Sequence, residues 1–156
     1  KAANISRDEM LAVYGTALDP AIQAKLNEQQ LQRLHEEIDQ SHCGMLPESQ
    51  FAAMVRVQQA RDAKMAASLA EGVAGTGVRV LIAGNFHARR DLGVPNYIAA
   101  EQGRVLSIAF LEVQAGERDP LAYLDVFSQT LPYDYVWFTP SVVPEDYCAG
   151  MRGDTN

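Results

Sequence analysis

A short apolar run from Val78 to Ala83 constrains the fold of this chain more than any other feature. Apart from Arg79, every residue in the run is apolar, and Gly84 ends it. A continuous apolar run of this length is typical of a strand buried on both faces of a parallel sheet, because a strand with one face in water alternates with polar residues. We therefore expect a parallel sheet that contains this segment as a strand.

The segments on either side of this run predict an α/β fold. Upstream, capping residues and the helical spacing of apolar residues predict helices over residues 6–14, from residue 19, over 27–40 and over 47–71. Downstream, we expect a short helix over 95–102, a strand over 105–113, a helical segment over 121–127, a strand over 135–138 and an irregular tail after residue 144. This order indicates a mainly parallel sheet flanked by helices, with a helical N-terminal portion.

The predicted sheet is thin for such a fold. It has three strands, and none of them precedes the helical N-terminal third, whereas a doubly wound protein usually begins with strands that complete its sheet. A length of 156 residues suits one domain or a large part of one. We therefore expect residues 1–156 to be a single domain that forms the C-terminal part of a longer protein.

Charge and hydropathy argue against two classes of function. The net charge is −7 and the sequence pI is near 4.9, which disfavours a nucleic-acid surface, because such surfaces gather Lys and Arg against phosphates. No apolar run approaches the roughly 20 residues that a membrane-spanning helix needs. No signal peptide or lipidation cysteine is visible at the N-terminus.

The chain has two cysteines, Cys43 and Cys148. In a reducing compartment they would act as small apolar residues, whereas in a periplasm they could pair. The residues alone leave both alternatives open. If the protein is periplasmic, we expect a disulfide that ties the tail to the body of the molecule.

Polar residues interrupt the apolar face of the long helix predicted over residues 47–71. The predicted core stripe consists of Phe51, Val55, Gln58, Asp62, Met65 and Leu69. A buried carboxylate is costly unless it is paired or hydrogen-bonded, and Arg61 adjoins Asp62 in the sequence. This pattern fits either a structural Arg–Asp network or a helix face that lines a polar cavity.

The loop over residues 84–91 places polar side chains directly after the predicted strand. It contains Asn85, His87, Arg89 and Arg90, and ligands of open α/β sheets bind at the carboxyl ends of the strands. His87 could act as a ligand, a general base or a hydrogen-bond donor, and Arg89 or Arg90 could clamp an anion. A solvated loop without a ligand is the alternative. We predict that Arg61, Asp62 and His87 converge on one pocket at this edge of the sheet.

Two further residues are candidates for the same site. Tyr97 closely follows the basic loop, and it is either a core aromatic or a phenolate ligand of ferric iron, a role that tyrosine has in some haem proteins. A neighbouring arginine would favour the charged phenolate by lowering its pKa. His42 lies at a predicted helix end, where the helix dipole favours a cationic imidazole, and it is the weaker candidate.

Three segments together resemble the ChaN-like haem-binding lipoproteins. They are HCGMLPESQFAAMVRVQQARDAKMA over residues 42–66, VLIAGNFHARRDLGVPNYI over 80–98 and YDYVWFTP over 133–140. The resemblance runs from about Asn4 to Cys148. The wider group to which these lipoproteins belong also contains the Tiki and TraB proteins and the erythromycin esterases.

The resemblance implies a function and a set of motifs. ChaN-like proteins are iron-regulated envelope lipoproteins that bind haem through a tyrosine, with the haem held between two subunits. The wider group carries a Gly-Glu-x-His motif, an Arg-Asp/Asn motif and a Gly-x-x-His motif. Arg61-Asp62 matches the second motif and the segment from Gly84 to His87 matches the third, whereas the first occurs nowhere in this sequence. Its absence agrees with a chain that lacks the N-terminal part of the family.

We therefore expect a periplasmic or outer-membrane-anchored protein of haem and iron uptake, attached to the membrane only through a lipid anchor outside this chain. Haem, a second copy of the chain and other haem-uptake proteins are the expected partners. Tyr97 is the expected iron ligand, with His87 on a haem propionate and the other candidates around them: Asn85, Arg89, Arg90, Arg61, Asp62 and His42. The alternatives are a metal-dependent hydrolase that uses His87 with residues outside this chain, and a structural partner-binding domain.

Overall fold

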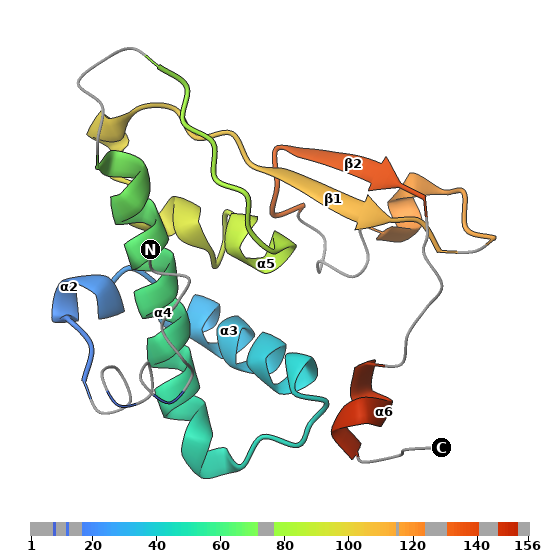
Figure 1. Cartoon of the computed structure of the whole chain (residues 1–156), viewed down its shortest axis with the longest axis horizontal. Coiled ribbons are helices and arrows are strands. Elements are labelled where there is room, and N and C mark those ends of the chain that lie inside the picture. Colours follow the sequence, from blue (N-terminus) through green and yellow to red (C-terminus); the bar gives the residue numbers. More distant parts are fainter. Residues whose placement is uncertain are drawn as a thin grey trace.

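The computed structural model describes residues 17–71, 77–114, 116–123, 131–140 and 147–152, together with residues 8 and 12. Most of the helices gather on one side of the molecule and a two-stranded sheet lies on the other (Figure 1). Apart from residues 8 and 12, the helix predicted over 6–14 lies outside the described residues. None of the described helices is long and apolar enough to span a membrane.

The helices α2 (Pro20–Gln23), α3 (Glu28–Ser41) and α4 (Glu48–Ala70) form the helical part. The α3 helix begins at a capping box, in which Asn27 and Gln30 each accept a hydrogen bond from the backbone N–H of the other. The α4 helix follows Pro47, which suits the start of a helix because it has no N–H to leave unpaired. The helices predicted over residues 27–40 and 47–71 are thus confirmed.

The main core lies where α3 and α4 meet the loop after α5 (Asn85–Ala88). Its members are buried leucine, isoleucine and phenylalanine side chains: Leu26, Leu34, Ile38, Leu46, Phe51 and Leu92. The α4 helix also buries Val57, Gln59, Ala60 and Ala66, while Val55, Gln58, Met65 and Leu69 of the predicted stripe are only partly buried. The predicted stripe was too narrow, because α2, α3 and η2 (Val94–Tyr97) all pack against α4 and together cover more than one face.

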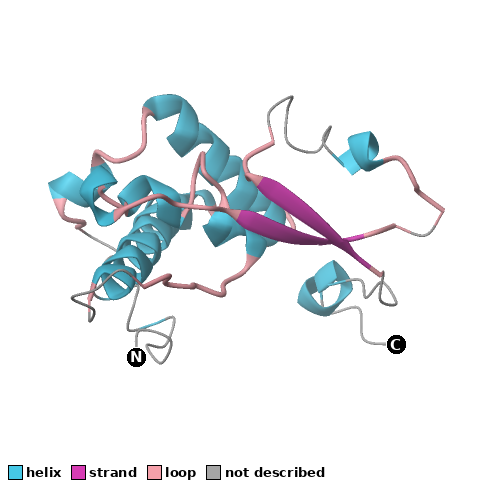
Figure 2. Ribbon diagram, turned by 90° about the horizontal axis from the view of Figure 1, so that it is seen from above, coloured by secondary structure: helices cyan, strands magenta, loops and turns pink. Residues whose placement is uncertain are grey.

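The sheet consists of β1 (Ile108–Glu112) and β2 (Tyr135–Thr139), which pair in parallel with Ile108 opposite Tyr135 and Phe110 opposite Trp137. Figure 2 shows the two strands side by side, next to the main group of helices. Both strands were predicted, and the α/β class with a parallel sheet is confirmed. The short 3-10 helices η2 and η3 (Ala100–Gln102) occupy the predicted helical segment before β1.

The remaining predicted strand, from Val78 to Ala83, is not a strand in this structure. The segment is extended, and Val78 and Ile82 are each 93% exposed. Beyond its end, the side-chain amide of Asn85 donates to the Phe110 carbonyl at 2.6 Å and accepts from the Phe110 N–H at 3.3 Å. That side chain therefore takes a place on the free edge of β1 that a neighbouring strand would otherwise use. An extended segment becomes a strand only when another strand supplies hydrogen-bond partners.

The region after β1 contains η4 (Pro120–Tyr123), in agreement with the helical segment predicted from residue 121, whose later part lies outside the described residues. The tail after Pro144 was predicted to be irregular, but it contains the helix α6 (Tyr147–Arg152). Cys148 in α6 forms a disulfide with Cys43, with their Cα atoms 5.8 Å apart, as predicted for an oxidising compartment. The bridge places α6 beside the end of α3.

Candidate functional site

Asp62 and His87 form the centre of the candidate site. Asp62 lies on α4 and is 1% exposed, and its Oδ1 atom is 2.6 Å from Nδ1 of His87 on α5 (Asn85–Ala88). Burial raises the pKa of Asp62, while the hydrogen bond and the charge of His87 oppose that rise. The predicted meeting of these two residues is therefore present in the structure.

Two other α4 residues flank this pair. Nε2 of Gln58 lies 3.1 Å from Nδ1 of His87, so the polar break in the helix face points at the imidazole. Arg61 is exposed, and its positive charge opposes the rise in the pKa of Asp62 that burial causes. Asp62 and His87 are not among the residues that line the cavities of about 610 and 480 Å³, so the contact of the pair is observed and the pocket around it stays a prediction.

Close packing of the loop after α5 fixes the backbone of His87. A Cβ atom on Gly93 would lie 2.7 Å from the His87 carbonyl carbon and 2.9 Å from the Phe86 carbonyl oxygen. Only glycine leaves room for this approach, because real Cβ contacts are longer. The hydroxyl of Ser107 also donates to the carbonyl of Ala88, the last residue of α5.

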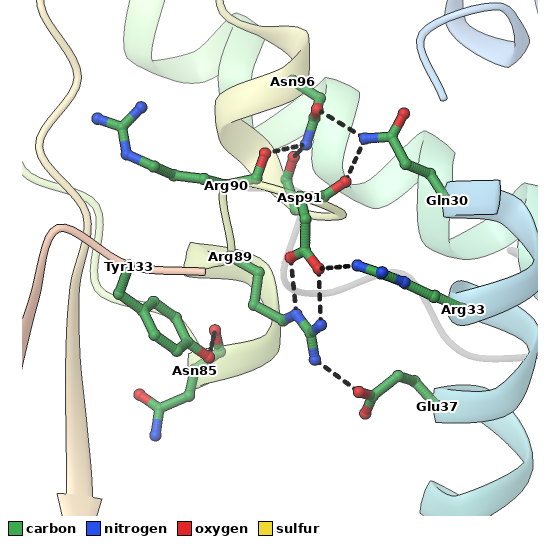
Figure 3. Close-up of polar contacts among 10 residues, drawn as sticks. Gln30, Arg33, Glu37, Asn85, Arg89, Arg90, Asp91, Asn96 and Tyr133 are labelled. Atoms are coloured by element: carbon green, nitrogen blue, oxygen red, sulfur yellow. Dashed lines mark hydrogen bonds and ion pairs between the residues drawn. The ribbon is translucent and has the colours of Figure 1, made fainter. Parts of the chain in front are cut away.

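Arg89 belongs to an internal ion-pair network (Figure 3). Its guanidinium donates to both Asp91 carboxylate oxygens, at 2.9 and 2.8 Å, and to Glu37 of α3 at 2.5 Å. Burial lowers the pKa of Arg89, but the bonds and charges of Asp91 and Glu37 outweigh burial and raise it. Of the two arginines that could clamp an anion, Arg89 therefore has its guanidinium on carboxylates of the chain itself.

Arg90 points the other way, toward the start of the sheet (Figure 3). It donates to Asp134 at 2.8 Å and to the Val105 carbonyl at 2.6 Å. The bonds from Arg90 and from the Ser107 N–H hold the pKa of Asp134 below its usual value. Arg90 also lines a cavity of about 610 Å³ together with Arg104, on the side of the loop where β2 begins.

Tyr97 has a buried hydroxyl. Among the described residues, no atom forms a hydrogen bond with its Oη. Burial is the main cause that raises the pKa of Tyr97 to about 12. The negative charge of Asp62 adds to this rise, and the nearby side-chain amide of Gln59 opposes it. The expectation that a neighbouring arginine would lower this pKa is wrong, because Arg89 and Arg90 are engaged by carboxylates elsewhere.

Tyr97 also lines a groove of about 480 Å³ between α2 and α4. Most of the other lining side chains are small and apolar, with Lys25 and Glu71 as the charged members: Ala21, Ile22, Lys25, Ala63, Ala66, Ala67, Ala70 and Glu71. Pockets for small ligands have this size and character, being mainly apolar with a few polar groups. This groove therefore contains Tyr97, the predicted site residue on η2.

Asn85 and His42 have structural contacts. Asn85 holds the edge of β1 with its side chain, and its carbonyl accepts from the hydroxyl of Tyr133 at 3.1 Å (Figure 3). The imidazole of His42 lies 2.7 Å from the Ile38 carbonyl at the end of α3. Within the described residues, no three His, Cys, Asp or Glu side chains gather as a metal site.

The sequence reasoning missed three residues that shape this region: Glu37, Gln59 and Gly93. Glu37 forms an ion pair with Arg89, which lies 52 positions later in the sequence, and no local sequence pattern predicts such a contact. Gln59 is 1% exposed, and the stripe placed Gln58 inward instead. For Gly93 the sequence did offer a signal, since this glycine stands between two apolar residues, Leu92 and Val94, which the structure buries.

Comparison with known proteins identifies the family. The sequence profile described as "Haem-binding uptake, Tiki superfamily, ChaN" matches residues 2–98, which is more than half of the chain. The match includes α2, α3, α4, the Asp62–His87 pair and Tyr97. Comparisons with curated proteins and with solved structures find no match. On the strength of the profile match, this chain belongs to the ChaN family of haem-binding uptake proteins in the Tiki superfamily.

Proposed function

We propose that this protein binds ferric haem for uptake at the bacterial cell envelope, with Tyr97 as the iron ligand. The observation that carries this proposal is the buried Tyr97 hydroxyl, which has no hydrogen-bond partner among the described residues and belongs to a side chain that lines an apolar groove. A buried polar atom without a partner is costly and calls for a functional explanation. The family supplies haem as the ligand.

The chemistry of the tyrosine fits a metal ligand. With a pKa of about 12, the phenol is protonated at neutral pH, so Tyr97 would lose its proton on binding. Ferric iron supplies the positive charge that stabilises the phenolate, as bound metal ions do for other ligands that must ionise. Tyrosine is an established ligand of haem iron.

Some of the remaining candidate residues would contact haem, and others would hold the contacting residues in place. We propose that His87 holds a propionate of haem, which lies between two copies of the chain, and that Asn85 and Arg89 brace the loop on which His87 sits. Arg90 is held by Asp134 but keeps a half-exposed side chain at the larger cavity. Arg61 is exposed beside Asp62 and contributes positive charge near this site.

Replacing Tyr97 with phenylalanine tests the proposal. Tyr97→Phe keeps the ring and removes only the oxygen, so it should abolish the tyrosinate charge-transfer band of the haem complex and weaken haem binding by at least tenfold. Because the lost oxygen has no hydrogen-bond partner in the described residues, the free energy of unfolding should hold or rise slightly. Absorbance titration with ferric haem and urea unfolding measure the two effects.

Tyr135→Phe is the matched control, since Tyr135 is 62% exposed on β2 and its loss should leave the haem spectrum unchanged. If Tyr97→Phe keeps both the spectrum and the affinity of the wild type, Tyr97 is a packing residue and our assignment fails. Sedimentation of the haem complex should show two copies of the chain, and a haem-bound monomer would contradict the shared site.

We further propose that the chain is the C-terminal part of a longer envelope protein. The extended segment from Val78 to Ala83 exposes apolar side chains, and a further strand alongside it would bury them and complete the sheet. The disulfide between Cys43 and Cys148 supports an oxidising compartment. The intact mass of the protein isolated from its native cells should exceed 17.1 kDa, and an equal mass would contradict the proposal.

A further inference from the structure

We propose that Asp62 is a positioning residue, which orients the His87 imidazole so that its Nε2 atom faces a carboxylate of the ligand. This inference rests on the proposed function, because the propionates of haem supply the carboxylate. Asp62 is almost fully buried, and its Oδ1 atom lies 2.6 Å from Nδ1 of His87. The contact joins α4 to α5 across 25 positions of the chain.

The contacts of Nδ1 determine which ring nitrogen carries the hydrogen. When Asp62 is ionised, its carboxylate can only accept a hydrogen bond, so the short contact then places a hydrogen on Nδ1. Gln58 lies on the same nitrogen at 3.1 Å, and an amide N–H cannot donate to a nitrogen that already carries a hydrogen. The two ends of an amide have nearly the same shape, so Gln58 fits with its oxygen toward the ring.

This arrangement leaves Nε2 as the ring atom for a ligand. The His87 side chain is 19% exposed, while that of Asp62 is 1% exposed, so a ligand meets the imidazole and not the carboxylate. To bind a propionate, Nε2 must also donate, which makes the ring an imidazolium. The negative charge of Asp62 stabilises that cation, as carboxylates behind histidines do in other sites.

A purely structural role for Asp62 would have different consequences. A carboxylate that only ties α4 to the loop would affect stability, and its loss would act on haem binding independently of His87. A positioning role makes the two residues act as a unit, so that the effect of removing Asp62 disappears once His87 is gone.

The first test is ¹⁵N NMR of the His87 ring in the haem-free protein. We expect a hydrogen on Nδ1 in the wild type, and we expect that signal to change in Asp62→Asn. A wild-type ring with an unprotonated Nδ1 would overturn the inference. This measurement on the wild type decides the matter even if Asp62→Asn fails to fold.

The second test is a double-mutant cycle with ferric haem as the probe. Asp62→Asn and His87→Gln should each weaken haem binding by about tenfold or more, and the double variant should bind no more weakly than His87→Gln alone. Glu48→Gln removes the same charge from the exposed first turn of α4 and should bind haem like the wild type.

The outcomes separate this inference from the proposed function. If the wild type binds haem and the two effects add in the double variant, the positioning role is wrong while haem binding by Tyr97 stands. If the wild type does not bind haem, the proposed function fails, and the ligand part of this inference fails with it.

Discussion

Gly93→Ala should cost about 3 kcal/mol or more of the free energy of unfolding, at the upper end of what overpacking produces. The backbone of Gly93 has φ −91°, which any residue can adopt, so the cost comes from space alone. The added Cβ atom would overlap the carbonyl groups of Phe86 and His87. These are backbone atoms of α5, which cannot move aside as the end of a flexible side chain can.

The same substitution should also displace His87. To make room, α5 must separate from the loop that carries Leu92, and the contact between His87 and Asp62 should lengthen or break. Urea unfolding measures the stability, and the ¹⁵N shifts of the His87 ring report the local change. Gly84→Ala is the control, because a Cβ atom there meets nothing within 4 Å and stability should change by less than about 1 kcal/mol. A Gly93→Ala variant as stable as the wild type would refute the packing argument.

Removing the disulfide should lower stability by about 2–5 kcal/mol. Cys43 and Cys148 are 105 positions apart, so the bridge closes a long loop and restricts the unfolded chain strongly. Chain-entropy models give on the order of 4–5 kcal/mol for such a loop, often less in practice. We expect Cys43→Ser with Cys148→Ser to unfold at a lower urea concentration than the oxidised wild type, and to be insensitive to reductant.

The conformation of Cys43 offers a control for this prediction. Cys43 has φ 58°, a left-handed conformation that costs a residue with a side chain roughly 1–2 kcal/mol. Cys43→Gly with Cys148→Ser removes the bridge but relieves this strain, so it should lose about 1 kcal/mol less than the serine pair. If reduction leaves the wild-type midpoint unchanged, the bridge contributes nothing to stability, and its support for an envelope location weakens.

Local patterns in the sequence predicted most of the helices and both strands. The α3 and α4 helices follow from their spacing of apolar residues and from the signals at their starts, Asn27 with Gln30 and Pro47. The strands β1 and β2 follow from short apolar runs. These signals are local, because both the hydrogen bonds of a helix and the periodic spacing of apolar residues involve residues that are near one another in the sequence.

The segment from Val78 to Ala83 is a case in which a local sequence pattern predicted the wrong structure. Its composition is that of a buried strand, yet Val78 and Ile82 are almost fully exposed. Whether an apolar run becomes a strand depends on another strand beside it, and the composition of the run carries no information about that partner.

The candidate site divides in the same way. The sequence by itself determined that Asp62 interrupts an apolar helix face and that His87 follows an apolar run, and their meeting could be inferred from these two facts. Only the tertiary structure decided that Arg89 binds Glu37 and Asp91, and that the Tyr97 hydroxyl is buried with a pKa of about 12. Charge and burial act through space, between groups that the chain brings together only when it folds, so a residue's type states what it can do while its surroundings decide what it does.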